Sequence, residues 1–309
     1  MSVYLVTGGA GFIGSHLVRA LLAQGDAVRV YDNFSTGKRA NLPETASGLE
    51  VWEGDVRDHA HLQTALQGVD YVLHQAAFVS VAQSIEEPLT CFEINVQGTA
   101  NVLEAARQAS VRRVVLASSA AVYGDSQALP LVEDTPAACL SPYAAAKHSS
   151  EITARLYTQV YGLPVVSLRY FNIYGPRQSP NSDYAAVIPI WVRQMMAGKA
   201  PQVFGDGGQS RDFVYVGDVV RANLLAPEAP RAPGQVFNIC SGVEISLLDL
   251  LDVLAELIPG TAAPTFGPPR AGDIYTSVGD LSRAVQVLGF TPQTSLLDGL
   301  AQTVTWMRS

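Results

Sequence analysis

The residues of this chain best suited to acid–base chemistry are Tyr143 and Lys147, which are four positions apart. The stretch 142–161 is expected to be helical, and side chains four apart share one face of a helix. A free tyrosine has a pKa near ~10 and is a poor base at neutral pH. A neighbouring ammonium, or a second cation bound beside it, stabilises the phenolate and lowers that pKa. The pair can therefore work as a general base, although the same spacing also occurs in surface pairs that have no function.

Two hydroxyls are expected at the end of a buried strand. Ser118 and Ser119 follow the apolar run 114–117. Open α/β sheets bind ligands at the carboxyl ends of their parallel strands. A hydroxyl there can hydrogen-bond a substrate oxygen, and the alternative is a serine that only ends the strand.

A glycine-rich turn near the N-terminus indicates what binds beside these residues. The sequence Thr7-Gly8-Gly9-Ala10-Gly11-Phe12-Ile13-Gly14 lies between an apolar strand and a helix expected over 13–24. Glycines allow a tight turn and let a pyrophosphate approach bare amides at the helix N-terminus. A second strand, 27–31, ends at Asp32, which is placed to bind an adenosine ribose. Asp32 would repel a 2′-phosphate, so NAD is favoured over NADP, with Lys38 and Arg39 nearby as the opposing signal.

The elements around these residues alternate between strand and helix. Strand patterns fall at 2–6, 27–31, 49–53, 70–73, 112–117 and 164–168, with helical patterns near 13–24, 59–67, 88–109 and 142–161. This order predicts an α/β fold, a Rossmann-type doubly wound parallel sheet. We expect residues 1–169 to form the NAD-binding domain and residues 170–309 a smaller α/β substrate domain. The two are interleaved, because the strand-like runs 213–216 and 236–239 return toward the large sheet.

Composition narrows the class of protein further. The 309 residues carry a net charge of −8 without a basic block, which argues against a nucleic-acid partner. The start of the chain shows neither a charged leader nor an apolar run of transmembrane length, so we expect a cytoplasmic protein without a membrane partner. Three scattered cysteines and five histidines show no metal-ligand spacing, and no metal is expected.

Taken together, these motifs resemble the extended short-chain dehydrogenase/reductases over nearly the whole chain. Besides the glycine turn and the Tyr–Lys pair, the matching residues are Asp55-Val56, Asn95 and Ser118-Ser119-x-x-Val122-Tyr123-Gly124. The segments 169–178 and Gly205-Asp206-Gly207-x-x-x-Arg211-Asp212-Phe213 are similar to the nucleotide-sugar branch of that family. Related dehydratases and decarboxylases need an acidic residue after the catalytic Ser or Thr, where this chain has Ala120 and Ala121. The resemblance is therefore best to the UDP-sugar 4-epimerases.

The resemblance implies a mechanism and a set of NAD contacts. Tyr143 would remove the proton of the sugar 4-hydroxyl, Ser119 would bind the same oxygen, and Lys147 would tune Tyr143 and hold the nicotinamide ribose. The implied cofactor-binding residues are Gly8, Gly11, Phe12, Ile13, Asp32, Asn33, Ser35, Thr36, Gly37, Asp55, Val56, Gln75, Ala76, Ala77, Asn95, Tyr143, Lys147 and Tyr170.

The resemblance also implies a UDP-sugar site. Asn172, Arg211 and Arg270 would bind phosphate, and Asp273 the uridine ribose. A serine at position 277, where a bulky residue would exclude an acetamido group, leaves room for N-acetylhexosamines. Four further positions would line that group, namely Ser80, Asn172, Gln178 and Ala186. Val79 departs from the glycine common in such relatives and would narrow the pocket.

Three functions stay open from the sequence. The first is a 4-epimerase acting on both UDP-glucose and UDP-N-acetylglucosamine. The second is a UDP-uronic acid epimerase or a nucleotide-sugar reductase, and the third is a non-catalytic NAD-binding protein, which should lack the Tyr–Lys pair. Apolar residues on the helices at 88–109 and 142–161 would pair across a two-fold axis into a homodimer, as in family members, or would pack on the sheet.

Overall fold

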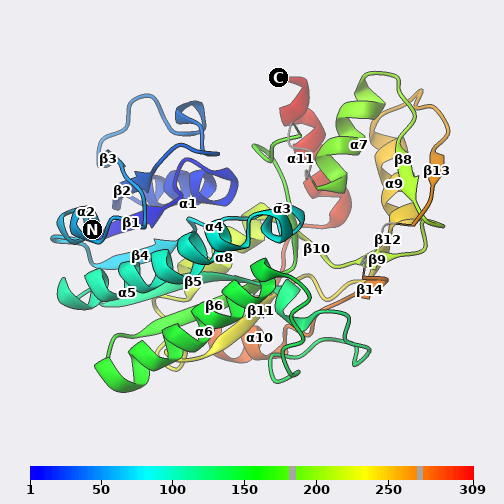
Figure 1. Ribbon diagram of the computed structural model, residues 1–309. Coiled ribbons are helices and arrows are strands. Elements are labelled where there is room, and N and C mark those ends of the chain that lie inside the picture. The colour runs from blue at the N-terminus through cyan, green and yellow to red at the C-terminus, as the bar shows by residue number, and fades with distance from the viewer. Residues whose placement is uncertain (181–185, 270–273) are drawn as a thin grey trace.

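A seven-stranded parallel sheet forms the larger part of the molecule in this computed structural model, which describes residues 1–180, 186–269 and 274–309 (Figure 1). The strand order is β11-β6-β5-β4-β1-β2-β3. The strands are β1 (Val3–Thr7), β2 (Ala27–Asp32), β3 (Leu49–Glu53), β4 (Tyr71–His74), β5 (Arg113–Ser119), β6 (Val165–Tyr170) and β11 (Val236–Ile239). From β1 the chain adds β2 and β3 on one side, and it then crosses to add β4, β5 and β6 on the other side. The strand order therefore switches direction between β1 and β4, and this switch point leaves a crevice at the carboxyl ends of these two strands. The predicted doubly wound fold is confirmed.

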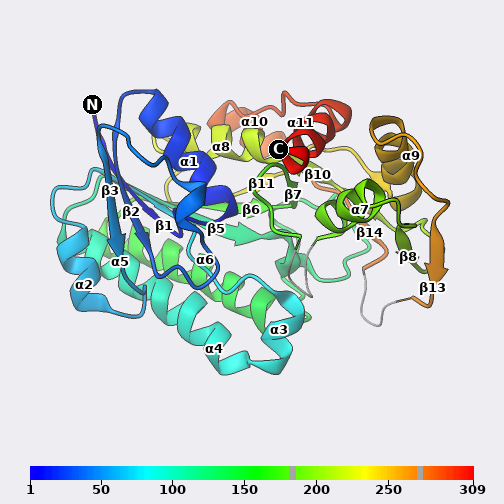
Figure 2. The ribbon, with the colours of Figure 1, turned by 90° about the horizontal axis from the view of Figure 1, so that it is seen from above.

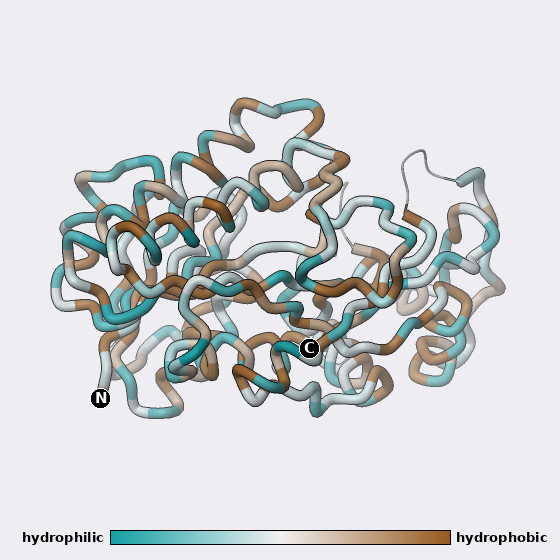
Figure 3. Tube along the Cα trace, turned by 90° about the horizontal axis from the view of Figure 1, so that it is seen from below, coloured by the Kyte–Doolittle hydropathy of each residue, from teal (hydrophilic) through white to brown (hydrophobic). Residues whose placement is uncertain are grey.

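Helices cover both faces of this sheet (Figure 2). One face carries α1 (Phe12–Ala23), α8 (Val216–Leu225) and α10 (Ser282–Leu288), and the other α2 (His59–Ala65), α5 (Gly98–Gln108) and α6 (Pro142–Tyr161). Because strand side chains alternate, Tyr4 and Val6 join the core under α1 while Leu5 joins the core under α5. Figure 3 shows the hydrophobic stretches concentrated along these central strands.

The helical stretch expected over 88–109 is interrupted. Ahead of it lies α3 (Val81–Glu86), and then α4 (Pro88–Phe92) leads through a π-helical turn, Glu93–Gln97, into α5. The carbonyl of Asn95 in this turn accepts hydrogen bonds from the hydroxyls of Thr99 (2.6 Å) and Ser150 (2.9 Å). These side chains satisfy a carbonyl that the wider turn takes out of the regular helical pattern.

The remaining residues form a smaller second body. Its core packs α7 (Val187–Met196), α9 (Leu247–Leu257) and α11 (Leu296–Arg308) around Trp191, Leu250 and Leu300. Helix α9 begins in a capping box between Ser246 and Asp249, which pair reciprocally with each other's backbone amides. Two small sheets complete the second body. One pairs β8 (Gln202–Phe204) with β13 (Thr265–Gly267), and the other pairs β9 (Ser210–Arg211) with β12 (Ile245–Ser246) and β14 (Thr276–Ser277).

One predicted strand position is wrong. Residues 236–239 do return to the large sheet as β11, beside β6, but the run at 213–216 does not. Residues Phe213–Tyr215 form β10, which pairs with β7 (Asn172–Tyr174) in a separate two-stranded sheet. Strand β7 begins just after the end of β6 and therefore lies beyond the carboxyl edge of the large sheet. Because β10 pairs with β7, it lies beyond that edge as well. Across the described ranges, no helix combines the length and apolarity needed to cross a bilayer.

Candidate active site

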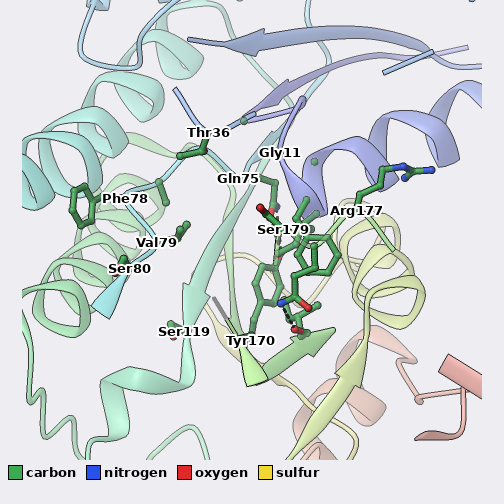
Figure 4. A pocket seen from close by; sticks show the side chains of 18 of the residues that line it. Gly11, Thr36, Gln75, Phe78, Val79, Ser80, Ser119, Tyr170, Arg177 and Ser179 are labelled. Atoms are coloured by element: carbon green, nitrogen blue, oxygen red, sulfur yellow. Dashed lines mark hydrogen bonds between the residues drawn. The ribbon is translucent and has the colours of Figure 1, made fainter. Parts of the chain in front are cut away.

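A cavity of about 1700 Å³ lies between the carboxyl edge of the sheet and the second body. It runs from the glycine turn after β1, past the ends of β4, β5 and β6, to β9 and α7. Figure 4 shows Gln75 and Tyr170 side by side in it, with Ser119, Val79 and Ser80 nearby. The cavity therefore joins the dinucleotide turn and two of the predicted catalytic residues, Ser119 and Tyr143, in one space.

The glycine turn has the shape that a dinucleotide requires. Gly8 has a φ of +66°, and a Cβ there would lie 2.7 Å from the amide nitrogen of Ala76. A Cβ on Gly14 would overlap the carbonyl oxygen of Gly8. Helix α1 begins after Gly11, and no side chain caps its N-terminus. The first amides of α1 can therefore receive a pyrophosphate, so this part of the site fits NAD.

Asp32 closes the adenosine side of the turn. Its buried carboxylate accepts hydrogen bonds from the amides of Ala10 (2.9 Å) and Phe34 (2.8 Å). The possible phosphate-binding cation Arg39 instead pairs with Glu53 (3.3 Å) and lies over the Phe34 ring. A 2′-phosphate here would meet carboxylates, which agrees with the preference for NAD.

Tyr143 lies in the first turn of α6, which begins at Ser141 and Pro142. The Ser141 hydroxyl caps the Ala144 amide, and the Tyr143 amide donates to the hydroxyl of Ser84 in α3 (3.2 Å). Burial raises the pKa of Tyr143, and a hydrogen bond with Ser119 acts against that rise. The phenol therefore needs additional positive charge before it can act as a base at neutral pH.

Lys147 lies behind Tyr143, away from the cavity lining. Its ammonium is 5.9 Å from the centre of the Tyr143 ring and donates to the carbonyl of Ala117 (2.8 Å). Burial lowers the pKa of Lys147 to about 8, while Cys91 and Glu151 oppose this shift. The lysine is therefore charged near neutrality and supplies positive potential beneath the phenol.

A buried hydrogen-bond chain holds the turn against the helices behind it. His74 contacts the Thr7 hydroxyl through Nδ1 (2.6 Å) and the Thr99 hydroxyl through Nε2 (3.1 Å), and Thr7 also accepts from the Ala76 amide (3.2 Å). Burial lowers the pKa of His74 to about 3, so the ring is neutral. Within the described residues no group of three His, Cys, Asp or Glu side chains is arranged to hold a metal.

Most of the predicted site residues meet in the cavity. Those lining it on the cofactor side are Gly8, Gly11, Phe12, Ile13, Asp32, Asn33, Ser35, Thr36, Asp55, Val56, Gln75, Ala76, Ala77, Tyr143 and Tyr170. Those lining it on the substrate side are Ser80, Ser119, Asn172, Gln178, Ala186 and Arg211.

A few predicted residues lie elsewhere. The side-chain oxygen of Asn95 accepts from the Phe78 amide (2.8 Å), and its nitrogen donates to the Phe78 carbonyl (2.9 Å). Asn95 therefore positions the loop after β4 instead of facing the cavity. Gly37 lies against Asp32, where a Cβ would be 2.9 Å from the carboxylate. Ser277 pairs with Arg211 across β14 and β9, beside the lining. Arg270 and Asp273 lie outside the described residues.

The cavity also contains residues that sequence reasoning did not single out. Phe204, Trp191 and Trp306 supply aromatic walls from the second body, and Arg177 lines the side next to α1. Arg177 stands inside the family-like segment 169–178, and Phe204 directly precedes the Gly205-Asp206-Gly207 turn. Their closeness to these motifs could have identified Arg177 and Phe204 as site residues. Trp306, in the last helix, is not close to any motif and could not have been identified in this way.

Comparison with known proteins agrees with this site. The family model described as "NAD dependent epimerase/dehydratase family" matches residues 4–240. A UDP-glucose 4-epimerase of Mycolicibacterium smegmatis is 41% identical over 310 residues, covering 99% of this chain and 98% of the relative. A UDP-glucose 4-epimerase structure from Thermotoga maritima with UDP-glucose is 38% identical, with a TM-score of 0.94 over 99% of this chain and 98% of that chain.

A further solved structure extends the comparison to acetylated sugars. The UDP-N-acetylglucosamine 4-epimerase of Methanobrevibacter ruminantium, in complex with UDP-N-acetylmuramic acid, is 36% identical, with a TM-score of 0.96 over 99% of this chain and 98% of that chain.

The fold and site define a nucleotide-sugar enzyme of the extended short-chain dehydrogenase/reductase class. The chain belongs to the NAD-dependent epimerase/dehydratase family, among its UDP-sugar 4-epimerases, and its cofactor is NAD. These assignments confirm the family, enzyme class and cofactor predicted from the sequence.

Proposed function

We propose that this enzyme inverts C4 of neutral UDP-hexoses, interconverting UDP-glucose with UDP-galactose and UDP-N-acetylglucosamine with UDP-N-acetylgalactosamine. The observation that carries the proposal is that Ser119 and Tyr143 line one cavity with the glycine turn, while Ala120 and Ala121 follow Ser119. An alanine cannot move the C5 proton that elimination requires. Hydride removal and return is the chemistry that these residues can complete.

The chain's residues divide this chemistry between them. Tyr143, as phenolate, takes the proton of the 4-hydroxyl and later returns it. Ser119 hydrogen-bonds the same oxygen, and Lys147 supplies the positive charge that stabilises the phenolate. The glycine turn and Asp32 would hold NAD, which would serve as the acceptor and then the donor of the C4 hydride.

Groups on the second body are suited to the nucleotide end of the substrate. Asn172 and Arg211 line the cavity, and Arg211 is held by the carbonyls of Ser210 (2.7 Å) and Tyr275 (3.3 Å). A guanidinium held in this way can bind a pyrophosphate through several N–H groups. We assign Arg270 to the same phosphates and Asp273 to the uridine ribose on family resemblance.

Two features favour acceptance of an acetamido group at C2. The side-chain oxygen of Gln178 is buried and has no hydrogen-bond partner among the described residues, while its amide nitrogen donates to the Ile173 carbonyl (3.1 Å). An acetamido N–H is the kind of donor that such an oxygen lacks. Ser277 beside Arg211 is small enough to leave room for the group, and Val79 in the cavity lining is largely exposed.

The charge of the lining argues against a uronic acid as the substrate. Residues 78–90 contribute two carboxylates to the described lining, Glu86 and Glu87, and no cation. The cations of the described lining lie elsewhere: Lys38 precedes η1 (Arg39–Asn41), Arg177 lies beside α1, and Arg211 is in β9. A sugar carboxylate near Ser80 would therefore be repelled.

Product analysis of the purified protein tests the proposal. It is incubated with UDP-glucose, UDP-N-acetylglucosamine, UDP-glucuronic acid and UDP-xylose, with and without added NAD⁺. We expect the 4-epimers of the first two without net NADH formation. Turnover of UDP-glucose alone would contradict the hypothesis that Gln178 and Ser277 accommodate an acetamido group at C2. Preferred turnover of UDP-glucuronic acid would replace the proposal with the uronate epimerase. Stoichiometric NADH would indicate a dehydrogenase or reductase, and no turnover with retained NAD binding a non-catalytic protein.

We also propose that the enzyme is a homodimer. Helix α6 exposes Ile152, Leu156 and Val160, and Leu89 on α4 is 76% exposed. Helices α4 and α6 pack against each other on the same face of the sheet (Figure 1), so these exposed side chains come from neighbouring helices. Two copies related by a two-fold axis would bury this apolar surface in a four-helix interface.

A further inference from the structure

A buried ion pair lies directly beneath the catalytic residues, between the sheet and α6. Ser118 and Arg169 are register partners on the neighbouring strands β5 and β6. Glu151 of α6 reaches both, accepting from the Ser118 hydroxyl (2.6 Å) and from two guanidinium nitrogens of Arg169 (2.8 and 2.7 Å). These three residues are 5% exposed or less, so their mutual contacts replace water.

The position of Glu151 relates it to the reacting groups. Tyr143, Lys147 and Glu151 follow one another at intervals of four on α6 and therefore share one helix face. The end of β5 is their common partner, because the Ala117 carbonyl accepts from Lys147, Ser118 donates to Glu151, and Ser119 bonds with Tyr143. Three consecutive strand residues are thus matched to three successive turns of the helix.

We propose that Glu151, held by Arg169, is a positioning residue that fixes β5 against α6 so that Ser119 and Tyr143 meet the same substrate oxygen, and that its carboxylate supports the positive charge of Lys147. This inference rests on the proposed epimerase chemistry and adds a role for Glu151 and Arg169, which are not part of the cavity lining.

The electrostatic part follows from the groups that surround Lys147. Without Glu151, the Lys147 ammonium would lose a negative charge that opposes the effect of burial, and Arg169 would lose its paired carboxylate. The pKa of Lys147, already lowered by burial, would then fall further. Among the described residues, the other titratable groups that face this ammonium are Cys91 on α4, the neutral His74 on β4 and Tyr143 on α6. His148 of α6 faces the Glu151 carboxylate instead, at 3.5 Å.

The positioning part follows from the rigidity of the pair. Arg169 also donates to the Glu133 carbonyl (3.1 Å), and its guanidinium lies 4.7 Å from the centre of the Tyr123 ring. Glu151 is therefore held from several directions and cannot change rotamer freely. A strand end tied to such an anchor keeps Ser119 in place, and displacements of about 1 Å in a reacting group can cost about a hundredfold in rate.

The experiment compares Ser118→Ala, Ser118→Thr and Glu151→Gln with the full-length wild type. For Ser118→Ala we expect kcat per NAD-binding molecule to fall about tenfold with little change in KM, and Ser118→Thr to restore it because the hydroxyl returns. For Glu151→Gln we expect a similar loss and an alkaline limb of the kcat profile displaced roughly one pH unit downward. Glu104→Gln is the matched control, since Glu104 pairs with Arg107 through two bonds on the surface of α5.

A second measurement is independent of turnover. The chain has three lysines, Lys38, Lys147 and Lys199, so a nuclear magnetic resonance titration of lysine-labelled protein resolves Lys147, with Lys147→Met as the assignment. Glu151→Gln should lower the midpoint of the Lys147 titration, and Glu104→Gln should not.

The outcomes separate the two proposals. If the wild type shows no epimerase activity, the proposed function fails, while the lysine titration still tests Glu151. If the wild type is active but Ser118→Ala and Glu151→Gln keep wild-type kcat and the Lys147 midpoint, the role of Glu151 is wrong. A fall in thermal stability with unchanged kcat per NAD-binding molecule would likewise reduce Glu151 to a structural role.

Discussion

The ammonium of Lys147 donates a 2.8 Å hydrogen bond to the carbonyl of Ala117, two residues before Ser119. This bond joins α6 to the end of β5 at the point where Ser119 and Tyr143, the two hydroxyls proposed to react, meet. It also holds a positive charge in a buried position beneath Tyr143, whose own burial disfavours the phenolate. The lysine therefore serves as a structural tie and as an electrostatic partner, and its two roles can be separated by measurement.

Replacement of Lys147 by methionine should stabilise the cofactor-free fold while abolishing activity. The pKa of Lys147 is lowered from 10.5 to about 8, so at pH 7 the folded protein carries a costly buried charge. Between pH 8 and 10.5 the unfolded chain binds more protons than the folded one, so wild-type stability from this group rises with pH and then levels off. The variant lacks that rise. Urea unfolding from pH 7 to pH 10.5 measures it, with Lys199→Met, at an exposed position, as the control. A variant less stable than the wild type at pH 7 would show that the Ala117 bond outweighs the burial cost.

Tyr143→Phe should remove turnover and preserve cofactor binding. The substitution deletes the group that moves the 4-hydroxyl proton, and loss of a general acid–base group costs about 10²- to 10⁴-fold in rate. The measurements are kcat by product analysis and NAD affinity by fluorescence. Tyr157→Phe on the same helix, whose hydroxyl contacts Glu104 at 3.2 Å, should keep near-normal kcat. Retained turnover in Tyr143→Phe would remove this residue as the base.

Gly14→Ala should impair both folding and NAD binding. A Cβ at this position overlaps the Gly8 carbonyl, so the turn must open or α1 must shift, at a cost of roughly 1–3 kcal/mol. Unfolding in urea and NAD titration are the measurements. Gly25→Asn provides the comparison, since Gly25 has a φ of +84°, which asparagine tolerates, and open space around it. Wild-type NAD affinity in Gly14→Ala would contradict the close packing of this turn.

Leu156→Glu should convert the proposed dimer into a monomer. Leu156 is 47% exposed in the middle of α6, and a carboxylate there cannot be buried in an apolar interface without a partner. Light scattering after gel filtration should show half the wild-type mass. Leu297→Glu on α11, at a position 45% exposed, should leave the mass unchanged. A wild type that is already monomeric, or a variant of unchanged mass, would exclude this surface as the interface.

Local patterns in the sequence were sufficient to predict the sheet and much of the site. Strands such as β1 and β6 are short apolar runs, and the first βα turn is defined by glycines whose spacing is itself a backbone requirement. Tyr143 and Lys147 were recognisable because helix geometry relates residues four apart. The π turn after α4 was not recognisable, because it depends on hydroxyls of Thr99 and of Ser150, and Ser150 comes from another helix.

By itself, the sequence determined most of the elements and the cofactor class, and it predicted the reacting groups, since these patterns involve residues close together in the chain. Only the tertiary structure decided how distant residues meet. It placed Lys147 on Ala117, turned Asn95 toward the Phe78 backbone, moved β10 away from the large sheet, and brought Glu151 between Ser118 and Arg169. The physical reason is that burial and buried hydrogen bonds depend on which surfaces pack together, and that packing is a property of the whole fold.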